Sequence, residues 1–328
     1  MNSLIDKYNR KIKYIRISVT DRCDLKCLYC KPKDIDSYSR RRAILRFEEI
    51  ARIVRCFADM GVSRVRITGG EPLVRKDMVS LIGQLSEISG IEDLAMTTNA
   101  TLLSKYAMDL KNAGLKRVNI SLDTLKSETF KTVCGGGELK DVLEGIREAV
   151  NVGLTPVNLN TVVMKGLNDN ELIDIVNFAI ENRATIRFIE CMPVRRIVNL
   201  SKERFISIKD VKSLIESHFE LEPSPSSGGG PASYFKIKGE TIKIGFISPV
   251  TQHFCESCNR VRLTAEGILR LCLGYKDGID LRDYIRSGIS DESLKEVIAK
   301  AIQDKPQGHQ FSNDKCIPIE QSMSMIGG

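Results

Sequence analysis

Hydrophobic and polar positions in the first two-thirds of the chain follow two alternating periods, and this alternation predicts a parallel sheet. Short apolar runs typical of strands occupy residues 14–20, 62–68, 94–98, 116–122, 157–164 and 185–190. Between them, apolar residues at three-to-four spacing predict helices near 47–60, 76–89, 102–113, 138–152 and 169–182. Six strand–helix units fall short of the eight of a closed barrel, so we expect a partial (β/α)6 TIM-like barrel.

The pattern changes after residue 221. Residues 222–233 (EPSPSSGGGPAS) are rich in Pro, Ser and Gly, which predicts a linker or a loop. Two antiparallel strands at 234–238 and 241–247 and helices near 279–286 and 292–304 are expected after it. We therefore divide the chain into a barrel, residues 1–221, and a C-terminal α+β extension, residues 222–328.

Composition narrows the setting of the protein. The chain of 328 residues has 49 basic and 42 acidic side chains, and the net charge of +7 favours an anionic ligand such as a nucleotide, a nucleic acid or a lipid. The N-terminal MNSLIDKYNRKIKY is too charged for a signal peptide, and the longest uncharged run, 149–164, is too short to span a bilayer. We expect a cytoplasmic protein with no membrane partner. Its ten cysteines then favour metal binding or redox chemistry over disulfides.

The first candidate metal site is Cys23, Cys27 and Cys30, spaced C-x3-C-x2-C directly after the first strand. Three thiolates on one loop can hold three irons of a cubane cluster and leave the fourth iron open, which suits chemistry better than simple electron transfer. A zinc site is the alternative. Zinc loops more often use C-x2-C pairs and need a fourth ligand, whereas the chain has only three histidines.

The second candidate site is Cys255, Cys258 and Cys272, spaced C-x2-C-x13-C. This spacing resembles half of a zinc ribbon, and His253 could supply a fourth ligand. Spacing alone therefore leaves zinc and an iron–sulfur cluster both open here.

The flanking sequences carry a family resemblance. The first cysteine set has Tyr29 before its third cysteine and is followed one strand later by Gly69-Gly70-Glu71-Pro72, which resembles the radical S-adenosylmethionine (SAM) superfamily. The segments CESCNRVRLTAEGILRLCL, TTNATLL, VNISLDTL and FIECMPV and the terminal Gly327-Gly328 resemble the GTP 3′,8-cyclase (MoaA) family of molybdenum cofactor biosynthesis. The resemblance covers nearly the whole chain and implies SAM and two [4Fe–4S] clusters, one on each cysteine set.

The resemblance also implies site residues. The implied SAM contacts are Tyr29, Gly70, Ser121 and Met192. The implied GTP contacts are Arg16, Arg66, Thr97, Asn158, Asn259, Arg260 and Arg262. The residues expected to take part in catalysis are Arg260, Arg262, Gly327 and Gly328, the last two on a tail that inserts into the active site.

Two features can be argued from the residues themselves. The family-like segments lie at the predicted carboxyl ends of the strands, where βα-barrels bind their ligands. Arg260 and Arg262 are two apart and face one way on a strand, and a hairpin turn at 265–267 would put Arg270 across from them. Facing cations repel, unless an anion lies between them or the surface is solvated.

Some residues depart from the expected pattern. Asn158 stands where many relatives carry a substrate-binding Lys, and nearby Lys165 is a candidate to compensate for it. Cys191 has no evident role beside Met192. Cys56, Cys134 and Cys316 are interpreted as structural or free thiols.

The implied reaction starts from GTP: a 5′-deoxyadenosyl radical removes the ribose 3′-hydrogen, and C3′ attacks C8 of guanine to give 3′,8-cyclo-7,8-dihydro-GTP. The implied partners are a cyclic pyranopterin monophosphate synthase downstream and a flavodoxin or ferredoxin as electron donor, with a monomer or homodimer as the enzyme and no nucleic acid.

Two alternatives stay open. One is a two-cluster peptide or sulfatase maturase, although these usually carry longer C-terminal cysteine sets. The other is a zinc-binding nucleic-acid-binding protein, which leaves the first cysteine set and Gly69–Pro72 unexplained.

Overall fold

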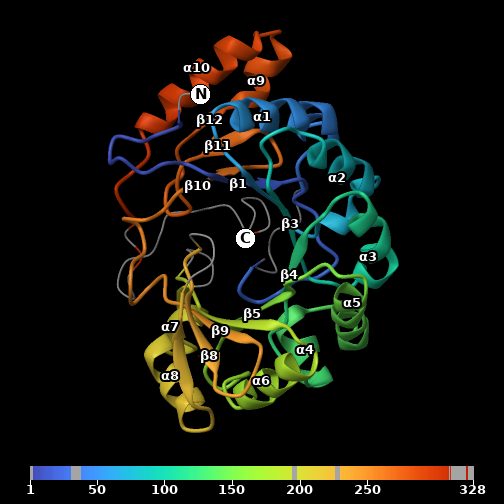
Figure 1. The fold of residues 1–328 in the computed structure, drawn as a ribbon, viewed down its shortest axis with the longest axis vertical. Coiled ribbons are helices and arrows are strands. Elements are labelled where there is room, and N and C mark those ends of the chain that lie inside the picture. The colour runs from blue at the N-terminus through green and yellow to red at the C-terminus, as the bar shows by residue number, and fades with distance from the viewer. Residues whose placement is uncertain are drawn as a thin grey trace.

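The computed structural model describes residues 3–30, 38–193, 198–225, 230–309, 311 and 323, with only the backbone at 198 and 199. One sheet runs through the molecule, and its helices lie mainly along the outer side of that sheet (Figure 1). In the part of the chain that is described, no helix combines the length and apolar character needed to cross a membrane.

Six parallel strands form the centre of the sheet, as the sequence pattern predicts. They are β1 (Tyr14–Ser18), β2 (Arg64–Thr68), β3 (Asp93–Thr98), β4 (Arg117–Ser121), β5 (Asn158–Val163) and β6 (Thr185–Glu190). Each pairs in parallel with the next. This arrangement confirms the partial barrel.

The last third of the chain extends this sheet at both ends. It supplies β10 (Arg260–Leu263), parallel beside β1, and β9 (Lys243–Ile247), parallel beside β6. Antiparallel neighbours complete the ends: β11 (Ile268–Arg270) and β12 (Gly278–Asp280) beyond β10, and β8 (Ser233–Ile237) and β7 (Leu221–Ser224) beyond β9. The order is β12-β11-β10-β1-β2-β3-β4-β5-β6-β9-β8-β7, so the described sheet is open rather than closed.

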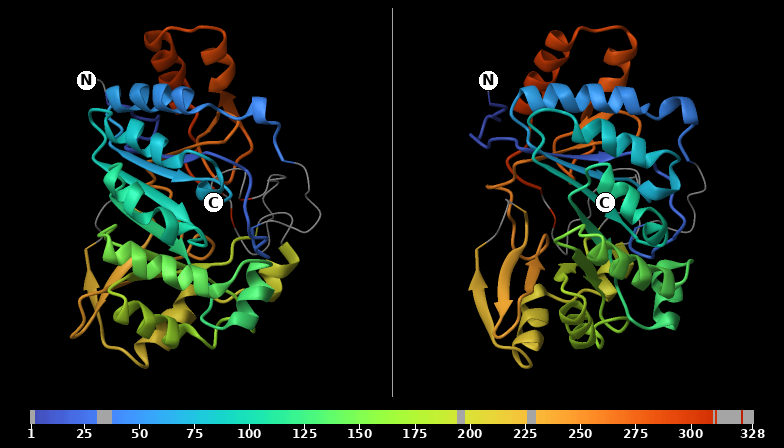
Figure 2. Two further views of the ribbon diagram at one scale, coloured as in Figure 1. Left: turned by 90° about the vertical axis from the view of Figure 1, so that its right-hand side faces the viewer. Right: turned by 45° about the vertical axis from the view of Figure 1, so that its right-hand side comes forward.

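The predicted helices form close to their expected positions. They are α1 (Phe47–Asp59), α2 (Met78–Ser86), α3 (Leu103–Asn112), α5 (Leu139–Asn151), α6 (Leu172–Glu181), α9 (Leu281–Arg286) and α10 (Asp291–Gln303). Further elements that the pattern did not predict are α4 (Ser127–Cys134), α7 (Val198–Glu203), α8 (Ile208–Glu216) and the 3-10 turns at Arg41–Ala43 and Pro72–Val74. Both views in Figure 2 show α9 and α10 beyond α1, at the end of the molecule that holds β12.

Strand alternation separates the core from the inner face. Ile15 and Ile17 on β1, and Ile67 on β2, are fully buried in the main hydrophobic cluster. Arg16, between the two isoleucines of β1, and Arg66, next to Ile67 on β2, therefore point to the opposite, inner face. The apolar half of each strand builds the core, and the polar half is left free to build a site.

The predicted linker, residues 222–233, needs correction at both ends. Ser233 begins β8, and residues 226–229 lie outside the described residues. Residues 222–224 belong to β7, which pairs with β8. Pro223 misled the prediction, because proline is tolerated at the edge of a sheet, where β7 lies. The division at 221/222 stays a prediction, and strands from both of its parts join one sheet.

Two helix glycines give a matched test of this packing. A Cβ on Gly145 of α5 would lie 2.6 Å from the carbonyl oxygen of Ala100, whereas a Cβ on Gly83 of α2 would meet nothing within 4 Å. We expect Gly145→Ala to lower the free energy of unfolding by about 1–3 kcal/mol, because the backbone must shift. Gly83→Ala should raise it by about 0.5–1 kcal/mol through helix propensity. Urea unfolding followed by circular dichroism measures both, and equal effects of the same sign would contradict the packing.

Candidate active site

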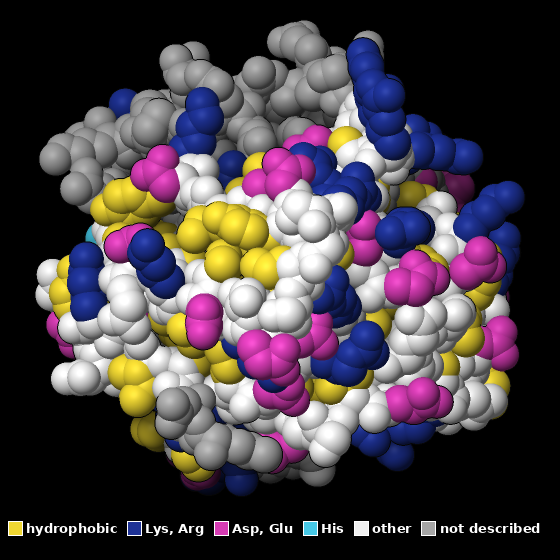
Figure 3. Space-filling view, turned by 90° about the horizontal axis from the view of Figure 1, so that it is seen from above, with side chains coloured by type: hydrophobic (Ala, Val, Ile, Leu, Met, Phe, Trp, Pro, Cys, Tyr) yellow, Lys and Arg dark blue, Asp and Glu magenta, His cyan; other side chains and the backbone are white. Residues whose placement is uncertain are grey.

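A cavity of about 1060 Å³ lies against the inner face of the sheet. It is lined by side chains from β1 to β6 and from β10, and by the first cysteine loop. Eight arginines and one lysine line it, against four acidic residues, so its charge is strongly positive. On the outer face seen from above, by contrast, basic and acidic side chains are interspersed (Figure 3).

The strongest charge feature of the cavity is a row of arginines on neighbouring strands. Arg16 of β1 is paired in register with Arg66 of β2 on one side and with Arg262 of β10 on the other. Arg262 is in turn opposite Arg270 of β11, which confirms the predicted hairpin and fixes its register. Paired residues share one face of a sheet, so Arg16, Arg66 and Arg262 all reach the cavity side by side.

The arginines of this row are buried, and burial lowers their pKa values. Desolvation, with repulsion from neighbouring arginines, lowers the pKa of Arg66 and of Arg262 to about 10. The pKa of Arg16 falls well below its ordinary value for the same reasons. Arginine nonetheless stays charged at neutral pH, so the row is a concentration of buried positive charge. An anion with several oxygens is the ligand that would relieve both the desolvation and the repulsion.

The first cysteine loop is joined to the sheet by the Gly69–Pro72 turn. The backbone N–H of Gly70 donates to the Thr20 carbonyl at 2.7 Å, and that of Glu71 donates to the Arg22 carbonyl at 2.8 Å. The Glu71 carboxylate accepts from Asn99 N at 2.6 Å and from the Thr98 hydroxyl at 2.8 Å. Burial raises the pKa of Glu71 to about 7. The turn thus connects the start of the cysteine loop with the carboxyl end of β3.

A second brace on this loop was missed in the sequence. The carbonyls of Val133 and Cys134, at the end of α4, accept from Leu28 N at 2.9 Å and Lys26 N at 2.8 Å. Gly135 follows with φ +64, and a Cβ there would lie 2.8 Å from the Lys26 carbonyl. The run Cys134-Gly-Gly-Gly was the available signal, because glycines allow this close approach of two backbones.

The residues expected to contact SAM gather at the same end of the cavity. Tyr29, Gly70, Ser121 and Met192 all line it. The Tyr29 hydroxyl donates to Asp123 at 2.6 Å, and burial raises the pKa of Asp123 to about 6.

Cys191 belongs to the packing around this end of the cavity. It lies in a small apolar cluster with Phe311, against which Tyr29 and Met192 pack. Burial raises the pKa of Cys191 to about 12, so it is a protonated thiol within this cluster. Cys191, which had no evident role in the sequence, therefore has a packing role.

The second cysteine loop lies next to Arg260 and Lys305. Arg260 Nη2 is 4.0 Å from Cys258 Sγ. Burial acts to raise the pKa of Cys258, but the charges of Arg260 and Lys305 outweigh it and bring that pKa down to about 7. Lys305 is itself buried and donates to the carbonyls of Arg260 and Leu271. Cationic neighbours of this kind favour the thiolate form that metals bind.

The two cysteine trios fit clusters better than single ions. Within the described residues, the one group of three potential ligands with all ligand atoms within 4.8 Å is His253, Cys255 and His309, so neither trio is drawn together that closely. Two thiolates on one tetrahedral zinc lie about 3.8 Å apart, given Zn–S bonds of about 2.3 Å. All-cysteine donor sets with wider spacing suit a multi-iron cluster.

Most of the predicted site residues meet in the cavity. Those that line it are Cys23, Cys27, Tyr29, Cys30, Gly70, Ser121 and Met192 at one end, and Arg16, Arg66, Thr97, Asn158, Arg260 and Arg262 along the inner face. The hydroxyl oxygen of Thr97 is buried and has no hydrogen-bond partner among the described residues. Such an atom is suited to a polar ligand.

Other predicted residues lie elsewhere. Asn259, Lys165 and the second cysteine trio are not among the lining residues, although Phe254 and Leu273, next to that trio, are. Lys165 is exposed, so it does not supply the charge missing at position 158. Gly327, Gly328 and Cys316 lie outside the described residues.

Several lining residues were missed. They are Arg64, Arg117, Arg183, Arg187 and Asn160. Strand alternation was the available signal, because Arg64 is two residues before Arg66, and Arg187 faces inward between buried Ile186 and Phe188.

Two family models match the chain. Residues 17–179 match the radical SAM superfamily, and residues 184–311 match the model described as Molybdenum Cofactor Synthesis C.

Curated relatives match over almost the whole chain. GTP 3′,8-cyclase from Petrotoga mobilis is 46% identical over 325 residues, covering 99% of this chain and 100% of the relative. The enzyme of that name from Thermodesulfovibrio yellowstonii is 47% identical and covers 98% and 99%. The crystal structure of Streptococcus suis SuiB bound to S-adenosylmethionine has a TM-score of 0.64 at 18% identity, covering 98% of this chain and 78% of that one, and shows the shared fold.

Gly70 and Gly136 give a matched test of the first cysteine loop. A Cβ on Gly70 would lie 2.2 Å from the Arg22 carbonyl oxygen, whereas on Gly136 the nearest atom would be at 3.5 Å. We expect Gly70→Ala to lose the first cluster, and so about half of the iron of the reconstituted protein, because the loop must move. Gly136→Ala should keep its iron. Iron and sulfide analysis with EPR of the reduced protein measures this, and full cluster content in Gly70→Ala would refute the role given to the turn.

Proposed function

This chain belongs to the GTP 3′,8-cyclase family of the radical SAM superfamily, and from that premise we propose how its cavity performs the reaction. The activity is that of a lyase acting early in molybdenum cofactor biosynthesis. Its cofactors are SAM and two [4Fe–4S] clusters. When bound, they would supply the electron and the 5′-deoxyadenosyl radical needed to remove the ribose 3′-hydrogen of GTP. A bond from C3′ to guanine C8 would follow. One further electron, from the external donor of the flavodoxin or ferredoxin kind through the second cluster, and a proton would complete 3′,8-cyclo-7,8-dihydro-GTP.

The arginine row is the observation that carries the substrate assignment. Arg16, Arg66 and Arg262 are held side by side by strand register, at a face where they repel one another. A triphosphate offers oxygens to each guanidinium, and rigid strands keep the donors in place before it binds. Arg260 extends the row toward the second cysteine loop. In this proposal the triphosphate lies along the arginine row, and the guanine base lies at the end of the row nearest Cys258.

The other end of the cavity suits SAM. Cys23, Cys27 and Cys30 hold the first cluster in this proposal, and Ser121, Gly70 and Met192 lie around the neighbouring space. Asp123 is kept in place by Tyr29 and by Val162 N, which donates to it at 2.9 Å. Both ligands would then be held in the same cavity, so that the group derived from SAM forms close to its target on GTP.

Asn158 has a different role from the Lys of many relatives in this proposal. Its Oδ1 accepts from Arg187 Nη2 at 2.7 Å, and Asn119 Oδ1 accepts from Arg187 Nη1 at 2.9 Å. Gly245 leaves room for the arginine stem, since a Cβ there would lie 3.0 Å from Arg187 Cγ. Asn158 is therefore a positioning residue that aims Arg187 into the cavity, rather than a weak substitute for a cation.

The remaining features of the function stay predictions. Met323 lines the cavity five positions before the chain ends, which supports a tail that carries Gly327 and Gly328 into the site. Handover to a cyclic pyranopterin monophosphate synthase, an electron donor of the flavodoxin or ferredoxin kind, the cytoplasmic location and the monomeric or dimeric state belong to the same proposal. Membership of the cyclase family argues against the maturase and the zinc-dependent nucleic-acid-binding alternatives.

Formation of 5′-deoxyadenosine tests the proposed function. The reconstituted protein is given SAM and dithionite with GTP, with ATP or with no nucleotide, under anaerobic conditions. Strong formation only with GTP, together with the cyclised product, is the expected result. Equal formation in all three would retain the radical chemistry and overturn the GTP assignment.

Asn158→Lys tests the positioning role. The variant removes an acceptor from Arg187 and places a second cation beside it, so we expect KM for GTP to rise about tenfold, with a smaller change in kcat. If position 158 merely lacks a charge, the same variant should lower KM. Lys165→Ala, outside the cavity, is the control and should leave both constants unchanged.

A further inference from the structure

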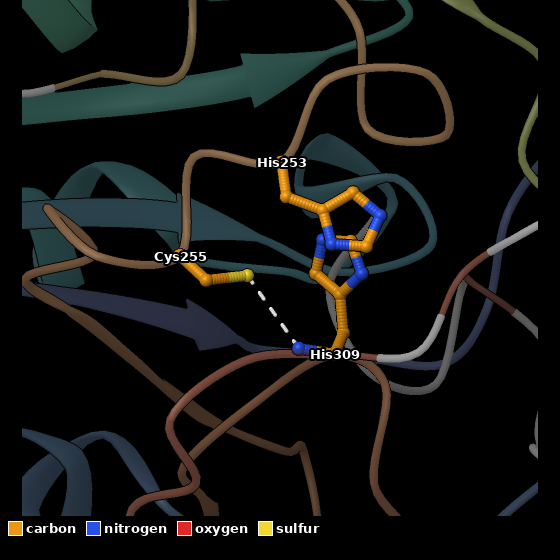
Figure 4. A group of neighbouring side chains, drawn as sticks. All are labelled: His253, Cys255 and His309. Carbon is orange, nitrogen blue, oxygen red and sulfur yellow. Dashed lines mark hydrogen bonds between the residues drawn. The ribbon is translucent and has the colours of Figure 1, made fainter.

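Two imidazoles lie beside the second cysteine loop and have no part in the function proposed above. Figure 4 shows His253 and His309 with overlapping rings, and Cys255 next to the backbone of His309. One ligand atom from each of the three residues lies within 4.8 Å of the other two. The ring centroids of the two histidines are 4.5 Å apart.

A buried arginine fixes the two segments that carry these residues. Arg10 donates to the Cys255 carbonyl at 2.9 Å, to the Gln307 carbonyl at 2.7 Å and to the Pro306 carbonyl at 2.6 Å. It is itself paired with buried Asp6 at 2.6 Å. The hydrogen bonds of Arg10 therefore hold the two loops together without any metal.

The hydrogen bonds of the rings leave nitrogen atoms for a ligand. His253 Nε2 lies 3.1 Å from the Phe311 carbonyl, which can only accept, so this nitrogen carries the proton and Nδ1 keeps its lone pair. Metal-binding histidines commonly donate their other nitrogen to a backbone carbonyl in this way.

His309 supplies the second, independent observation. His309 is only 8% exposed. Its Nε2 is buried and has no hydrogen-bond partner among the described residues. Its Nδ1 accepts from Phe311 N at 3.3 Å, a long contact. Coordination through Nε2 requires the tautomer with the proton on Nδ1 and gives up that contact.

We propose that His253, Cys255 and His309 form a site for one divalent transition-metal ion, such as Zn²⁺ or Fe²⁺, in the cluster-free protein. One thiolate and two imidazoles are ligands that these ions favour. Around a tetrahedral ion, the sulfur and nitrogen ligands lie about 3.5 Å apart, inside the observed spacing. The exposed side of His253 leaves the fourth position to water.

The site shares Cys255 with the proposed second cluster, so the two cannot be filled together. A single ion bound here therefore competes with cluster assembly. His253 and His309 would be the residues that distinguish the two states, because the cluster needs Cys258 and Cys272 and the single ion does not.

Cobalt binding to the full-length, cluster-free chain tests the site under anaerobic conditions. We expect one Co²⁺ with a sulfur-to-cobalt charge-transfer band and tetrahedral d–d absorption. His253→Ala and His309→Ala should each weaken binding by about tenfold or more. Cys255→Ser should abolish the charge-transfer band. His218→Ala, at the third and exposed histidine, is the control and should change nothing.

Cys258→Ser separates this site from a cysteine-only one. It should retain Co²⁺ binding if the proposal holds and lose it if the ion sits on Cys255, Cys258 and Cys272. Unchanged affinity in both histidine variants, or loss in Cys258→Ser, would overturn the proposal. Because the titration uses neither SAM nor GTP, its outcome is independent of the cyclase assignment.

Zinc pre-loading tests the competition. The wild-type chain loaded with Zn²⁺ should rebuild its second cluster more slowly than the metal-free chain, and His253→Ala should reduce the difference. Equal rates with and without zinc would refute competition between the two states.

Discussion

Burying several guanidinium groups next to one another is the constraint around which this molecule is arranged. Arg16, Arg66 and Arg262 lie in one register across three strands, and both desolvation and mutual repulsion act against them. Such a cluster persists because the alternate residues of the same strands, Ile15 and Ile67 among them, are locked into the core. The free energy that the core supplies holds the charges in place, and an anionic ligand recovers part of it on binding.

The same constraint explains the extended, open sheet. The first six strands alone would leave β1 and β6 as exposed edges, and they would lack Arg262. The last third of the chain covers both edges with β10 and β9 and delivers that arginine. Arg10 and Lys305 then attach the chain after α10 to the second cysteine loop. The boundary predicted at 221/222 therefore marks a change in sequence character, while packing and charge are shared across it.

Local patterns predicted the parts of this arrangement that depend on local physics. Hydrophobic periodicity predicted the six central strands, most of the helices between them, and the position of the first cysteine loop and of Gly70 directly after β1 and β2. The turn at 265–267 predicted a hairpin that brings Arg270 across from the Arg260–Arg262 pair, and the structure fixes its register. The parallel pairing of β9 with β6 and of β10 with β1 could not be predicted in this way. The paired strands are far apart in the sequence, and neither β9 nor β10 exceeds five residues. The position of Arg187 was missed for a related reason, since Asn119, Asn158 and Gly245 come together only in the folded sheet.

The two cysteine loops differ in what surrounds them. The first is held by backbone contacts from the Gly69–Pro72 turn and from the end of α4. Burial raises the pKa of Cys23, and a hydrogen bond with Cys134, together with burial, raises the pKa of Cys27. The second is held by buried cations. They bring the pKa of Cys258 to about 7, whereas burial raises the pKa of Cys272. Deprotonation at neutral pH is therefore costly in the first loop and nearly free at Cys258, and metal binding must supply the difference. A loop braced in this way and lining the cavity suits the first cluster in the proposed function. The positive charge next to Cys258 stabilises its thiolate whichever metal binds, and the two histidines beside Cys255 add further ligand atoms.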